Sequence, residues 1–131
     1  MSYYFTKKLS ASFDEAIEKV TEELENEGFG ILTEIDVKET LKKKLDQDIY
    51  KYKILGACNP PLAYQALQVE DKIGAMLPCN VIVQEKEEGE VEISAVDPVA
   101  SMQAVNNKDL EDVARDVRGR LEKVIRSLSV N

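Results

Sequence analysis

The sequence predicts an α+β fold, in which an antiparallel or mixed sheet of about five strands carries helices mainly on one face. Two long segments, 13–24 and 110–128, repeat apolar residues at helical spacing. Shorter segments alternate apolar and polar residues as strands do, and a glycine-containing loop joins two of them as a hairpin. The expected order of elements is β-α-β-α-β-α-β-β-α.

The first strand is expected in residues 3–9, which are rich in aromatic, branched and long side chains. Ser12 and Glu15 follow at the spacing of a capping box, which predicts the start of an amphipathic helix. Gly28 can adopt a positive φ and predicts the end of this helix. Residues 29–35 then predict the second strand.

A short polar helix is expected next, because Asp36 and Glu39 repeat the capping pattern. Residues 49–58 alternate well and predict a third strand. We expect its apolar face to carry the even-numbered residues Tyr50, Tyr52, Ile54, Gly56 and Cys58. The other face of this strand would then be wet.

Asn59 is a good N-cap and predicts a third helix that runs to about Gly74. Two strands, 79–85 and 91–97, are expected to form the hairpin, with Gly89 in the left-handed region of a three-residue loop.

The last part of the chain is expected to be helical. Residues 98–102 predict one turn, and Asn107 precedes a long amphipathic helix of about five turns. No linker or repeat divides the sequence, so we expect one domain over residues 1–131.

The charge of the chain argues against nucleic acid as a partner. The formal net charge is −8, from 25 acidic and 17 basic residues, whereas binding to phosphates depends on clustered Lys and Arg. The one basic run, 42–44, lies among acidic residues and predicts a solvated helix face.

We also expect no membrane segment and a cytoplasmic location. Residues 1–7 lack the pattern of a signal peptide, and no segment approaches the ~20 apolar residues that span a bilayer. The two cysteines, Cys58 and Cys79, are therefore expected to be reduced thiols.

Histidine is absent from the sequence, which excludes Ser-His-Asp and Cys-His nucleophile pairs and zinc sites built on imidazole. Any catalysis would depend on thiols, carboxylates, Tyr or Lys, or on a cofactor. Four tyrosines, at positions 3, 4, 50 and 52, are expected to be core or edge aromatics.

The hairpin register predicts where the two thiols lie. If Lys86 lies opposite Glu90, then Cys79 faces Asp97 across the strands. Cys58 ends the preceding strand, and it reaches the same rim of the sheet if the two strands are antiparallel.

We therefore expect a candidate pocket at this rim, next to a helix N-terminus that favours the thiolate form of a cysteine. The alternative is that both thiols are small buried hydrophobes and that the polar residues only cap helices and form turns. The candidate residues of the pocket are Cys58, Asn59, Tyr64, Cys79, Asn80 and Asp97.

Three segments, 55–63, 77–81 and 94–98, resemble in this order the domain-of-unknown-function 302 family, and the resemblance extends over nearly the whole chain. It implies a compact α/β domain, found in bacteria and archaea alone or fused to other domains, with no agreed activity. The motif residues of the family correspond here to Cys58, Asn59, Pro60, Pro78, Cys79, Asp97 and Pro98.

Two functional hypotheses follow. The first is a non-catalytic ligand-binding or interaction module, with a homodimer as one form, in which the rim holds a small ligand or metal ion or only stabilises the fold. The second is a thiol-dependent enzyme or redox protein in which Cys58 is the activated nucleophile, Cys79 is the resolving or ligand partner, and Asp97 is the proton acceptor or orienting group. A metal site built from the two thiolates, Asp97 and water lies between them.

Overall fold

The computed structural model describes residues 2–129. Its centre is a five-stranded sheet in the order β1-β5-β4-β3-β2, in which every neighbouring pair is antiparallel. The strands are β1 (Tyr4–Ser10), β2 (Gly30–Asp36), β3 (Lys51–Cys58), β4 (Cys79–Glu87) and β5 (Glu90–Val96). The α+β class, the antiparallel sheet and the order of elements predicted from the sequence are confirmed.

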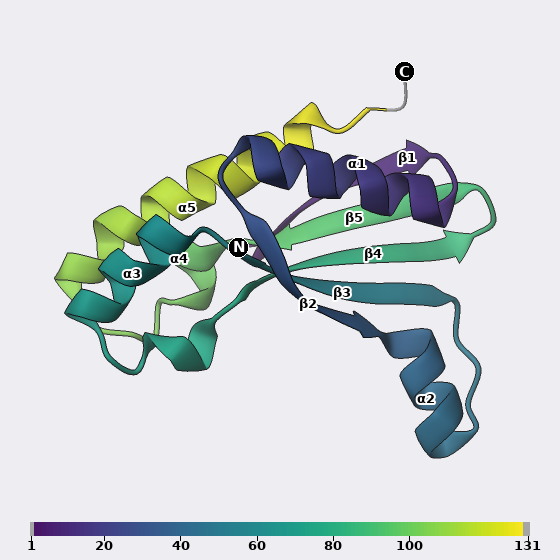
Figure 1. Cartoon of the computed structure of the whole chain (residues 1–131), viewed down its shortest axis with the longest axis horizontal. Coiled ribbons are helices and arrows are strands. Elements are labelled where there is room, and N and C mark those ends of the chain that lie inside the picture. Colours follow the sequence, from purple (N-terminus) through teal and green to yellow (C-terminus); the bar gives the residue numbers. More distant parts are fainter. Residues whose placement is uncertain (1, 130–131) are drawn as a thin grey trace.

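The helices lie mainly on one face of this sheet (Figure 1). They are α1 (Phe13–Asn26), α2 (Val37–Leu45), α3 (Pro60–Val69), the 3₁₀ helix η1 (Ile73–Met76), α4 (Pro98–Ser101) and α5 (Lys108–Ser127). Helices α1 and α5 cover the sheet, α3 lies beside α5 beyond one end of the sheet, and α2 projects on the other side. No helix within residues 2–129 is both long and apolar enough to cross a bilayer.

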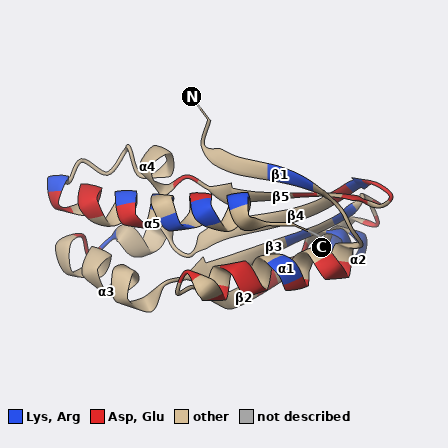
Figure 2. Cartoon of the chain, turned by 90° about the horizontal axis from the view of Figure 1, so that it is seen from above, with Lys and Arg blue, Asp and Glu red and all other residues tan. Residues whose placement is uncertain are grey.

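Figure 2, a view from above, shows that Lys, Arg, Asp and Glu residues recur along both covering helices. The core lies between these helices and the sheet. Val81, Val83 and Ile93 of the sheet are completely buried against Leu24 and Leu121 of α1 and α5. Each such side chain contributes about 1.5–3 kcal/mol through burial. The apolar stripes of the two long helices therefore face the core, as their amphipathic patterns predict.

Local capping signals also appear as the sequence predicts. The side chains of Ser12, Asp36, Asn59 and Asn107 each accept a hydrogen bond from a backbone N–H in the first turn of a helix. Helix α3 ends earlier than predicted, at Val69. The Val69 carbonyl, which has no partner within the helix, accepts a hydrogen bond from Asn107 Nδ2 at 2.7 Å.

The face assigned to the third strand is wrong. Leu55 and Ala57, not the even-numbered residues, lie in the core. Tyr52 and Ile54 pair with Gln84 and Ile82 of β4 on the uncovered face. The even-numbered side chains of this strand do share one face of the sheet, but α1 and α5 cover the opposite face.

The hairpin register is confirmed in its middle and wrong near the loop. Val81 pairs with Ala95, and Val83 pairs with Ile93. Beyond Gln84 the register shifts, so that Glu87 rather than Lys86 pairs with Glu90. An extra residue in β4 forms a bulge and shortens the loop, and Gly89 keeps the predicted positive φ, at 82°.

Candidate functional site

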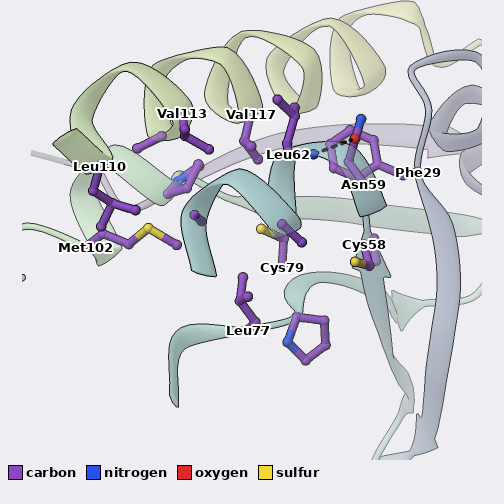
Figure 3. A pocket seen from close by; sticks show the side chains of 16 residues that line it. Phe29, Cys58, Asn59, Leu62, Leu77, Cys79, Met102, Leu110, Val113 and Val117 are labelled. Atoms are coloured by element: carbon purple, nitrogen blue, oxygen red, sulfur yellow. Dashed lines mark hydrogen bonds between the residues drawn. The ribbon is translucent and has the colours of Figure 1, made fainter. Parts of the chain in front are cut away.

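An apolar pocket lies where α3 and α5 meet the end of the sheet (Figure 3). It follows the border between two apolar clusters, the main core and a smaller cluster of Ala66, Ile73 and Leu110. The free space is small, about 30 Å³. We call it the thiol pocket, because both cysteines of the chain contribute to its wall.

The two thiols reach this pocket from neighbouring strands. Cys79 begins β4, pairs with Ala57 and is 7% exposed. Cys58 is the last residue of β3, is partly exposed and also lines the pocket. Both are free thiols, and their sulfur atoms lie apart in Figure 3.

Burial raises the pKa of the Cys79 thiol to about 11, and the neighbouring Cys58 adds a smaller contribution in the same direction. The thiol form is uncharged, so an apolar environment favours it over the thiolate. Cys79 is therefore protonated at neutral pH and is a poor nucleophile there.

Asn59 occupies the end of the pocket next to α1. Its side-chain oxygen accepts a hydrogen bond from Leu62 N at 3.3 Å, and its amide nitrogen donates to the Glu27 carbonyl at 3.3 Å. Arg120 donates to the same carbonyl at 3.1 Å. Both ends of the Asn59 amide are thus used to hold α3 against the end of α1.

Asp97 does not lie in the thiol pocket. Pairing between β4 and β5 begins at Val81, and β5 ends at Val96, so the predicted pair of Cys79 and Asp97 falls beyond the ladder. The Asp97 carboxylate instead accepts hydrogen bonds from Val99 N, at 3.0 Å, and from Ala100 N, at 3.4 Å, as the N-cap of α4.

The Asp97 carboxylate also lines a separate surface hollow, together with Phe5 and Arg118. Arg118 of α5 donates from Nε to the carboxylate at 3.0 Å and stacks over the Phe5 ring. The hydrogen bond to Asp97 and its negative charge raise the pKa of Arg118. Within residues 2–129 no three Cys, Asp or Glu side chains come together as metal ligands, which leaves the metal hypothesis without its third ligand.

The other two candidate residues also lie outside the pocket. Asn80 pairs with Gly56 on the uncovered face of the sheet, and Tyr64 is 66% exposed on α3. The structure therefore brings together Cys58, Asn59 and Cys79 of the six candidates. Sequence reasoning missed the rest of the wall, of which Leu110, Val113 and Val117 belong to the apolar stripe of α5 that the sequence assigns to the core.

The capping role of Asp97 gives a first prediction. Asp97→Ala removes the acceptor of two backbone N–H groups and is expected to lower the free energy of unfolding by about 1 kcal/mol. Asp97→Asn keeps a capping oxygen and is expected to lose less than half of this. Urea denaturation measures both variants, and an equal loss in the two would contradict capping as the main contribution.

Comparisons with known proteins agree with this fold. The model of the family described as "Domain of unknown function DUF302" matches residues 5–128. The crystal structure of an uncharacterized conserved DUF302 protein from Bacillus stearothermophilus superposes with a TM-score of 0.88 and 31% sequence identity, covering 96% of this chain and 98% of that one. A comparison with curated proteins found no match. The chain therefore belongs to the DUF302 family.

Proposed function

We propose that this protein is a non-catalytic binding module and that its thiol pocket receives a small apolar group of the ligand. The composition of the pocket wall carries this proposal: apart from Asn59, the wall consists of apolar side chains and the two thiols. The Asn59 amide is already hydrogen-bonded at both ends. A ligand in this pocket would thus gain from apolar burial and not from hydrogen bonds.

The size of the pocket limits what enters it. A free volume of about 30 Å³ is close to the ~30 Å³ that one water molecule occupies in the liquid, so a longer alkyl group requires α3 to move. This helix buries only Leu62 and Ala66 and carries no charged residue. The pocket follows the border between two clusters, so α3 can shift with the smaller cluster and leave the main core intact.

Thiol catalysis is the second candidate, and the geometry favours it less. The predicted mechanism needs Asp97 beside the thiols, but this carboxylate caps α4 and binds Arg118. The resolving thiol, Cys79, has a raised pKa and is protonated at neutral pH. The same thiols suit an apolar wall, because an uncharged cysteine behaves as a small hydrophobe.

Binding of linear alcohols from butanol to octanol tests the proposal. We expect affinity measured by calorimetry to rise up to about fourfold with each CH₂ that becomes buried, which corresponds to ~0.8 kcal/mol per group. Ala66→Val narrows the pocket and should weaken octanol binding by about tenfold. The matched control is Ala75→Val, which adds the same groups at an exposed position of η1 outside the pocket.

Two results would contradict the proposal. One is equal alcohol binding by the Ala66→Val and Ala75→Val variants, because binding would then occur elsewhere. The other is a turnover that disappears in Cys58→Ser, which would establish the thiol-dependent enzyme instead.

A further inference from the structure

Four of the five tyrosines in the chain gather on the face of the sheet that α1 and α5 leave uncovered. Tyr3 and Tyr4 lie at the β1 edge and are 67% and 43% exposed. Tyr50 directly precedes β3, Tyr52 is the second residue of that strand, and both side chains are half-buried. The fifth, Tyr64, lies on α3. This concentration is independent of the thiol pocket, which faces the helices.

The tyrosines form two pairs, and Tyr3, Tyr4 and Tyr52 line a hollow on this face. The Tyr3 and Tyr4 ring centroids are 5.0 Å apart in an edge-to-face arrangement, and those of Tyr50 and Tyr52 are 6.1 Å apart. Strands β5 and β4 lie between β1 and β3 in the sheet, so they form the floor. The hollow, which we call the tyrosine trough, has a volume of about 490 Å³ and is lined by residues that include Tyr3, Tyr4, Tyr52, Asn80, Gln84 and Ser94.

The floor offers hydrogen-bonding groups that the protein does not use. Gln84 donates from Nε2 to the Tyr50 hydroxyl at 3.1 Å, which fixes its amide. Among residues 2–129 the Gln84 carbonyl oxygen and the Asn80 amide have no hydrogen-bond partner. Ser94 shares a hydrogen bond with Thr6 at 2.8 Å. Two carboxamides are therefore available to a ligand between the aromatic side chains.

The charges at the trough favour an uncharged ligand. Lys86 and Glu92 both line it, and their side chains form an ion pair at 3.6 Å. Among the described residues that line the trough, no unbalanced positive charge remains to attract a phosphate or carboxylate. The net charge of −8 on the whole chain adds a repulsion against anions.

We propose that the tyrosine trough binds an uncharged heteroaromatic ring compound of the size of a nucleobase or nucleoside. Tyrosine rings stack on such rings, and Asn and Gln carboxamides pair with a ring edge that carries a donor beside an acceptor. The volume of about 490 Å³ falls within the range of about 300–1,000 Å³ that is usual for sites of small molecules.

Calorimetric titration with adenosine and uridine tests the proposal. We expect at least one of them to bind saturably below millimolar concentration, and the corresponding monophosphate to bind at least several-fold more weakly. Tyr3→Ala removes one stacking ring and should weaken nucleoside binding by about tenfold. Asn80→Ala should weaken it to a similar extent, and the side-chain amide NMR signals of Asn80 and Gln84 should shift on binding.

Tyr64→Ala is a closely matched control, because Tyr64 is 66% exposed and Tyr3 is 67% exposed, and it should bind the nucleoside as the unchanged protein does. Three results would overturn the proposal. The first is absence of saturable binding of either nucleoside, and the second is an equal effect of Tyr3→Ala and Tyr64→Ala. The third is a homodimer in sedimentation that Tyr3→Ala dissociates, because a second copy would then cover the trough.

Discussion

Gly56→Ala is expected to lower the free energy of unfolding by about 3 kcal/mol, at the upper end of the usual effect of overpacking. Gly56 is buried in β3 and pairs with Thr33 of β2 and Asn80 of β4. A Cβ atom on Gly56 would collide with the Thr33 side-chain oxygen and would lie 2.7 Å from Cγ of Pro78. The Thr33 side chain can rotate, but the Pro78 ring has little freedom, so the strands must separate.

A double-mutant cycle measured by denaturant unfolding separates the contribution of the Thr33 contact from that of the Pro78 contact. Thr33→Ala removes the oxygen and should recover part of the loss in the Gly56→Ala background, with the contact to Pro78 remaining. Gly30→Ala is the matched control, because Gly30 starts the neighbouring strand and a Cβ atom there would meet no described atom within 4 Å. An equal loss at Gly30 and Gly56 would show that general strand propensity, and not close approach, determines the cost.

Gly56 also bears on the thiol pocket, because it lies two residues before Cys58, and Pro78 directly precedes Cys79. The close approach of Gly56 to Pro78 therefore sets the distance between the two chain segments that carry the thiols. A variant that forces these segments apart should enlarge the pocket as well as destabilise the fold. Alcohol binding by Gly56→Ala would report this enlargement.

Local signals in the sequence are sufficient for most of the fold. A capping side chain acts within three residues of its partner, as Ser12 does with Glu15 N and Asn59 with Leu62 N. The amphipathic stripe of α5 is equally local, since its apolar residues repeat along one helix. The antiparallel pairing of Val81 with Ala95 follows from a hairpin, which joins strands that are adjacent in sequence.

The candidate site is less predictable, because it depends on contacts between distant segments. The alternation in β3 shows that its two faces differ in polarity. It does not say which of these faces the helices cover. The sequence alone therefore places the tyrosines either in the core or at an edge of the sheet. The predicted register extends to Asp97, one residue beyond the end of β5, where the chain already turns into α4. Arg118 binds Asp97 from 21 residues away along the chain, and no local pattern in the sequence predicts that pair.

Raising the pH from about 8 to about 11 is expected to remove about 2 kcal/mol of stability through Cys79 alone. Burial raises the pKa of the Cys79 thiol from an ordinary value of 9.0 to about 11 in the folded protein. Because the folded pKa is the higher one, this contribution is complete below about pH 9 and is lost as the pH rises through about 11. A difference of about 2 pKa units corresponds to roughly 3 kcal/mol in full, most of which is lost by about pH 11.

The comparison of the unchanged protein with Cys79→Ala isolates this contribution, because the two proteins share every other ionisable side chain. The free energy of unfolding should fall more steeply with pH in the unchanged protein, and Cys58→Ala, which keeps Cys79, should retain most of that steeper fall. Parallel curves for the unchanged protein and Cys79→Ala would mean that water reaches Cys79 freely. The thiol pocket would then be open to solvent, and its apolar wall could not provide the binding energy proposed for it, so this titration tests the stability of the fold and the character of the site together.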